Sequence, residues 1–218
     1  MKSRLTLLIG LGLLAPVSIA NAIPPGPCVH GEVSSNSGVI LVCPKGDGPS
    51  LASKGLTISV RILDGYGNPI ANWPKKDIGL VAEGMYACPT AFAGTILVAD
   101  AATDADGRTT ISGVPKGGGC ENGGGVYVAV RDNGAVLYLG DAGGTDCNVI
   151  TVPITIRSPD LNGDGTVSLS DYSQFVAIYQ NGPYNECADF NGDGVISLPD
   201  FSMFTTHYQP GHPDHSCQ

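Results

Sequence analysis

Two twelve-residue segments near the end of the chain carry oxygen-bearing side chains at the spacing of a calcium-binding loop. They cover residues 160–171 and 189–200, an offset of 29 residues (189 − 160). Each has a carboxylate or amide at positions 1, 3, 5 and 12, serine at position 9 and glycine at position 6, and position 7 offers a main-chain carbonyl. This is the oxygen cage of an EF-hand loop. The predicted ligands of two Ca²⁺ ions are Asp160, Asn162, Asp164, Thr166, Ser168, Asp171, Asp189, Asn191, Asp193, Val195, Ser197 and Asp200.

A pair of Asx-rich surface turns is the alternative interpretation of these segments. A second copy that matches at nearly every ligand position favours calcium. Position 12 is aspartate (Asp171, Asp200) rather than the usual bidentate glutamate. The shorter side chain predicts either weaker calcium binding or a tighter loop.

The charge of the chain is concentrated around the two loops. The protein has 11 Lys and Arg against 20 Asp and Glu, a net charge of −9. Residues 158–218 hold 8 acidic and no basic side chains (0 − 8 = −8), whereas residues 23–157 hold 12 and 9 (9 − 12 = −3). A small segment with this charge repels itself unless cations neutralise it, which favours two bound ions. The acidic balance also argues against nucleic acid as a partner.

The residues after each loop have helical spacing. Aromatic and apolar side chains recur three and four positions apart, and they are Tyr172, Phe175, Val176 and Tyr179 after the first loop and Phe201, Phe204 and Tyr208 after the second. No helix is expected before either loop, because Pro159 and the Asn181-Gly182-Pro183 turn stand there. Each repeat is therefore predicted to be a loop and the helix that leaves it.

This arrangement of residues 160–208 resembles dockerin modules. The resemblance implies a small all-α pair of calcium loop–helix motifs that folds around Ca²⁺ and docks onto a cohesin-like partner. It places the recognition surface at loop positions 10 and 11, which are Leu169-Ser170 and Leu198-Pro199 here rather than the hydroxyl pair often seen in that family. Calcium binding is thus more strongly implied than cohesin binding.

The preceding region predicts β-structure. Short runs rich in Val and Ile, separated by turn signals such as Asp64-Gly65 and Asp132-Asn133-Gly134, lie at 39–42, 56–63, 78–81, 109–111, 126–130, 135–139 and 149–156. About seven such strands favour an antiparallel sandwich. The segments 60–70 and 103–111 resemble the turns of bacterial immunoglobulin-like domains of the invasin type. The predicted fold class is mainly β, an immunoglobulin-like antiparallel β-sandwich over residues 23–157 followed by the dockerin-like module at 158–218.

The first 22 residues predict a secretory signal peptide. Lys2 and Arg4 precede an apolar run, Leu5 to Leu14, that is too short to span a membrane, and Ala20-Asn21-Ala22 fits a cleavage site. We therefore expect a secreted or cell-surface protein with no transmembrane segment after cleavage. Export permits disulfides. Of the seven cysteines, Cys187 with Cys217 and Cys28 with Cys43 are the pairs expected first.

No set of residues indicates catalysis. The β region has one histidine, His30, and nothing marks a pair of catalytic carboxylates. His207, His212 and His215 are close in sequence. A metal site is one interpretation of them, and an exposed tail is the favoured one. The sequence predicts a non-catalytic calcium-binding protein that docks to a protein partner or attaches to a surface. A structural cell-envelope protein and an accessory component of a polysaccharide-degrading complex are the alternatives.

Overall fold

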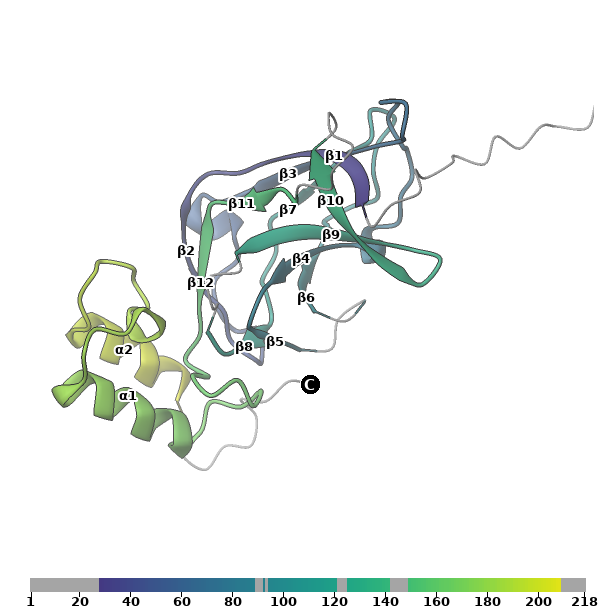
Figure 1. The fold of residues 1–218 in the computed structure, drawn as a ribbon. Coiled ribbons are helices and arrows are strands. Elements are labelled where there is room, and N and C mark those ends of the chain that lie inside the picture. Colours follow the sequence, from purple (N-terminus) through teal and green to yellow (C-terminus); the bar gives the residue numbers. More distant parts are fainter. Residues whose placement is uncertain (1–27, 89–91, 93, 121–124, 142–148, 209–218) are drawn as a thin grey trace, which may run out of the picture.

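The computed structural model describes residues 28–88, 92, 94–120, 125–141 and 149–208. A curved β-sheet forms most of it, and two α-helices lie together at one end (Figure 1). The predicted signal peptide, Cys217, His212 and His215 lie outside the described residues. No helix in the described part of the chain has the length and apolar character needed to cross a membrane.

One sheet contains eight strands. Seven of them are hydrogen-bonded in the order β6–β4–β9–β10–β1–β3–β7, and β11 also pairs with β9. Only the β1–β10 pair in this sheet is parallel. The strands are β1 (Cys28–Ser34), β3 (Ile58–Leu63), β4 (Ile78–Ala82), β6 (Thr95–Val98), β7 (Arg108–Ile111), β9 (Val126–Asp132), β10 (Ala135–Asp141) and β11 (Thr151–Val152).

Two short ladders complete the β-structure. β2 (Gly38–Leu41) runs parallel to β12 (Ile154–Arg157), and β5 (Tyr86–Ala87) is antiparallel to β8 (Gly117–Gly118). Three 3₁₀ turns, at Ala52–Lys54, Lys75–Asp77 and Glu186–Ala188, connect other elements. Because β12 leads directly into the first predicted calcium loop, its pairing with β2 fixes where that loop begins.

Alternating side chains explain the core of the sheet. Ile58, Val60 and Ile62 of β3 are buried, while Ser59 between them is exposed. β4 has no such alternation, because all five of its residues are buried between neighbouring strands and the core. The apolar core gathers residues from both halves of the sheet.

The predicted immunoglobulin-like sandwich is wrong. A sandwich needs two separate hydrogen-bonded sheets, whereas here β1 pairs with β10 on one side and with β3 on the other. That single strand joins the two halves into one nearly closed, barrel-like sheet. The mainly β content itself is confirmed, with 35% of the described residues in strands.

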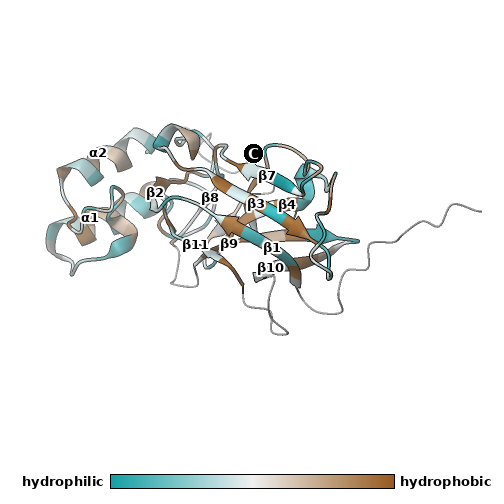
Figure 2. Ribbon diagram, turned by 90° about the horizontal axis from the view of Figure 1, so that it is seen from above, coloured by the Kyte–Doolittle hydropathy of each residue, from teal (hydrophilic) through white to brown (hydrophobic). Residues whose placement is uncertain are grey.

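The predicted all-α module is also absent. The described residues contain only two α-helices, α1 (Leu169–Asn181) and α2 (Leu198–His207). Their core is shared with the β-structure, because Leu41 and Cys43 pack into the same cluster as Phe175, Phe190 and Phe204. Both helices show hydrophilic and hydrophobic stretches in Figure 2, as expected for helices that bury one face.

Candidate calcium loops

Each helix begins with the same capping arrangement at the end of a predicted loop. Ser168 caps α1 and Ser197 caps α2, and the aspartate three residues later, Asp171 or Asp200, completes a capping box. The Asp171 carboxylate accepts hydrogen bonds from the main-chain N–H of Ser168 at 2.8 Å and of Asn162 at 3.1 Å. Position 12 therefore ties the helix start to the front of the loop.

The first aspartate of each loop is held by main-chain N–H groups. Asp160 Oδ1 accepts from Gly163 N at 2.9 Å, and Oδ2 accepts from Gly165 N at 2.8 Å. The second loop repeats this, with Gly192 N at 2.8 Å and Gly194 N at 2.9 Å from the Asp189 carboxylate. Gly165 and Gly194, at position 6, have φ of 85° and 87°, a conformation that glycine adopts without strain.

The remaining side chains of the loops also match between copies. Asn162 Oδ1 accepts from Asp164 N at 2.8 Å, and Asn191 Oδ1 accepts from Asp193 N at 2.9 Å. Two separate stretches thus fold into the same network of hydrogen bonds.

The carboxylates at positions 1 and 12 are buried. Asp160, Asp171 and Asp200 have 0% exposure and Asp189 has 2%, and none of the ion pairs recorded among the described residues involves them. Burial raises the pKa of Asp160 to about 6, against the opposing effect of the Gly165 hydrogen bond, and the nearby charges of Asp171 and Asp164 raise it further. Asp160 is therefore costly to ionise unless a cation compensates it.

The donor set fits a hard divalent cation. All the predicted ligands are oxygen donors, as Ca²⁺ requires. The three aspartates of a loop do not bring their carboxylate oxygens within 4.8 Å of one another. In an EF-hand, the amide at position 3 and the main-chain carbonyl at position 7 also bind the ion. The loops therefore contain further oxygen ligands besides their carboxylates.

No protein-family model matches this chain, and no curated protein and no solved structure is significantly similar to it.

The β-structure contacts the first loop through a glycine-rich strand. Gly119 N donates to the Asp160 carbonyl at 2.6 Å, and a Cβ added at Gly118 would overlap the Asp160 carboxylate. The sequence Gly117-Gly118-Gly119 looks like a flexible loop, but two of these glycines form β8. Because they have no side chains, these glycines leave room for Asp160. This role of the glycines was not predicted from the sequence.

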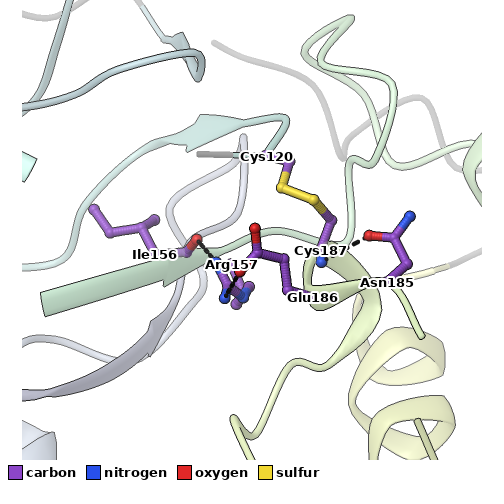
Figure 3. The surroundings of a disulfide bond; sticks show 6 residues. All are labelled: Cys120, Ile156, Arg157, Asn185, Glu186 and Cys187. Carbon is purple, nitrogen blue, oxygen red and sulfur yellow. Dashed lines mark hydrogen bonds and ion pairs between the residues drawn. A yellow bond between two sulfur atoms is a disulfide. The ribbon is translucent and has the colours of Figure 1, made fainter. Parts of the chain in front are cut away.

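A disulfide and an ion pair fasten the second repeat to the β-structure. Cys187, just before the second loop, is bonded to Cys120 (Figure 3). Beside it, Arg157 at the end of β12 lies 3.3 Å from the Glu186 carboxylate. Both expected cysteine pairs are wrong, since Cys187 bonds to Cys120 and Cys43 is free and buried.

A second cluster of possible metal ligands was not foreseen. Cys43, Asp47 and His207 form the one group in the described part of the chain whose three ligand atoms all lie within 4.8 Å. Burial raises the pKa of the Cys43 thiol, and the charge of Asp47 adds to this. The sequence offered one clue. His207 lies three residues after Phe204, so it continues the helical spacing of the aromatic side chains and belongs to the helix rather than to the polar tail.

Proposed function

We propose that residues 160–200 bind two Ca²⁺ ions and that the ordered loop–helix pair attaches a secreted, non-catalytic protein to a protein partner. One observation carries the proposal. Four carboxylates are withdrawn from water in two loops with the same hydrogen bonds, and no ion pair recorded for the described residues neutralises them.

Calcium supplies what this arrangement lacks. A carboxylate taken out of water is stable if it is protonated, hydrogen-bonded or compensated by positive charge, and a bound cation adds to the main-chain hydrogen bonds already present. The segment 158–218 has no Lys or Arg to provide that charge. Two Ca²⁺ ions bring four positive charges to an acidic excess of eight, and their binding free energy adds to the folding free energy of the region.

Exposed leucines support the attachment role. Leu169 and Leu198 occupy the same position in the two repeats, at the first residue of each helix, and they are 66% and 67% exposed. Exposed at matched positions of the two repeats, the two leucines offer apolar surface that a partner could bury. The resemblance of the repeats to dockerin modules suggests a cohesin-like or cell-surface protein as the partner.

Calcium titration of the chain without its leader tests the ion sites. We expect two Ca²⁺ per chain by calorimetry, one in Asp160→Asn and one in Asp189→Asn. Asp104→Asn is the matched control, because Asp104 also accepts main-chain N–H bonds, from Asp106 at 2.9 Å and Arg108 at 2.8 Å, but is exposed. No calcium uptake, or the same loss in the control, would reject the calcium sites.

Attachment is tested separately by affinity capture from the extracellular fraction of the source cells. The expected partner binds with calcium, is released by a chelator, and is lost with the double variant Leu169→Ser and Leu198→Ser. Calcium uptake without a leucine-dependent partner would instead favour a structural cell-envelope protein.

A further inference from the structure

Three side chains that bind transition metals meet where α2 ends against the turn after β2. The Cys43 sulfur, an Asp47 carboxylate oxygen and a His207 ring nitrogen lie within 4.8 Å of one another. Cys43 is 1% exposed, and the His207 side chain is 12% exposed. We propose that this cluster binds a divalent transition metal ion of the zinc type, which fastens the end of α2 to the β-sheet.

The donor atoms select the class of metal. One sulfur, one nitrogen and one oxygen suit Zn²⁺ and its neighbours, whereas Ca²⁺ takes oxygen alone. A tetrahedral Zn²⁺ with bonds of about 2.0–2.3 Å holds its ligand atoms about 3.3–3.8 Å apart. The three ligand atoms, which lie within 4.8 Å of one another, therefore need only small side-chain movements to bind one ion.

The state of His207 points to a missing partner. Its Nδ1 atom is buried and has no hydrogen-bond partner, although it lies 3.5 Å from Asp47 Oδ1. An unsatisfied buried ring nitrogen is costly. An ion between the imidazole, the Asp47 carboxylate and the Cys43 sulfur would supply the partner that His207 Nδ1 lacks.

The site is separate from the calcium loops. Asp200 and His207 are seven residues apart on α2 (207 − 200), about 10 Å along the helix axis. Three protein ligands leave one position of a tetrahedral ion open. His207 also lines a cavity of about 390 Å³ with Met203 and Thr206 of α2 and with Asn191 of the second loop.

Cobalt(II), which replaces zinc and absorbs light, tests the proposal on the calcium-saturated chain. One equivalent should give a sulfur-to-cobalt charge-transfer band that Zn²⁺ abolishes. Cys43→Ala should lose the band, and His207→Gln should bind about tenfold or more weakly. Asp47→Asn, at a side chain that is 37% exposed, tests the third donor where folding is least affected.

Two control variants make the result decisive. His30→Gln changes a histidine of β1, and the double variant His212→Asn and His215→Asn changes the last two histidines; both should retain the band. Each variant must keep the circular dichroism spectrum of the wild-type chain, which shows that it is folded whether or not calcium is bound. A wild-type chain without the band, a band that survives Cys43→Ala, or one lost with His212 and His215 would overturn the proposal.

Discussion

The β-sheet and the loop–helix region are stabilised by different means. The sheet buries a continuous cluster of aliphatic side chains contributed by strands along most of its length. The loop–helix region has a small core in which Phe175 stacks on Phe204 at 5.1 Å and on Phe190 at 5.6 Å, and it also buries four aspartates. Apolar burial stabilises the sheet in any ionic medium, whereas we propose that the second region depends on cations to offset its buried carboxylates.

The two regions are nevertheless joined at several points. The packing of Leu41 and Cys43 into the aromatic core, the Cys120–Cys187 disulfide and the hydrogen bond from Gly119 to Asp160 all cross between them. The comparison therefore concerns two sources of stability within one connected structure. Variants that destabilise one region and leave the other intact measure how far the stabilities of the two regions are independent.

The largest effect is expected from Phe175→Ala. Phe175 is fully buried and contacts four other aromatic rings, so its loss should cost about 3–5 kcal/mol. Hydrogen exchange in calcium should show faster exchange in α1 and α2 and unchanged protection in β9.

Leu80→Ala is the matched change in the sheet, because Leu80 of β4 is also fully buried. It should speed exchange in β4 and β9, at a cost of about 2–5 kcal/mol. If either variant lowers protection equally in both regions, the molecule unfolds as one cooperative unit and the distinction fails.

A smaller and more local effect is expected from Gly118→Ala. The added methyl group would occupy the space of the Asp160 carboxylate, so the first loop should lose its ion while the second keeps one. Calcium stoichiometry measures this. Gly113→Ala is the control, because its added Cβ would meet only the end of the Leu97 side chain, at 3.2 Å. Two ions retained in Gly118→Ala would mean that β8 does not position the first loop.

Local spacing made the loop–helix region predictable. The loop residues, the two helices and their aromatic faces follow from positions within about a dozen residues of each other, because capping boxes and helical periodicity are local. The structure places a helix at each predicted aromatic stretch, and each helix begins at position 10 of its loop, at Leu169 and Leu198. The calcium ions themselves remain a prediction.

The sheet was less predictable because one strand decides its topology. All seven predicted runs became strands, the last of them two strands (β11 and β12), but β1, β5, β6 and β8 were missed. β1 reads Cys-Val-His-Gly-Glu-Val-Ser, without a continuous apolar run, and yet it joins the two halves of the sheet. Pairing between distant segments is not encoded in local pattern, so the number of sheets could not be read from the strands that were found.

Distance along the chain also hid two features of the site. Cys43 and His207 are 164 residues apart (207 − 43), and Cys120 and Cys187 are 67 apart. The sequence favoured disulfides between cysteines that are near each other along the chain. The fold instead brings Cys187 to Cys120, just after β8. The same folding of α2 onto β2 places His207 beside Cys43.

The smallest effect expected is a pH dependence confined to the first loop. The pKa of Asp160 is about 6 in the ion-free fold, against 3.8 in its ordinary state, because the side chain is buried. The folded, ion-free chain therefore holds a proton there between pH 3.8 and 6 that the unfolded chain does not. Lowering the pH through 6 should stabilise the ion-free fold, and raising it should remove that stabilisation.

Calcium should reverse this trend, because the ion binds the ionised carboxylate and competes with the proton. At pH 5 a group with a pKa of about 6 is ionised in about one molecule in eleven, so calcium affinity at the first loop should fall about tenfold from its value at pH 7. Calorimetry on Asp189→Asn, which leaves only the first site, measures this change. An affinity that stays constant from pH 7 to 5 would contradict this prediction: Asp160 would then either not bind the ion or not have a raised pKa.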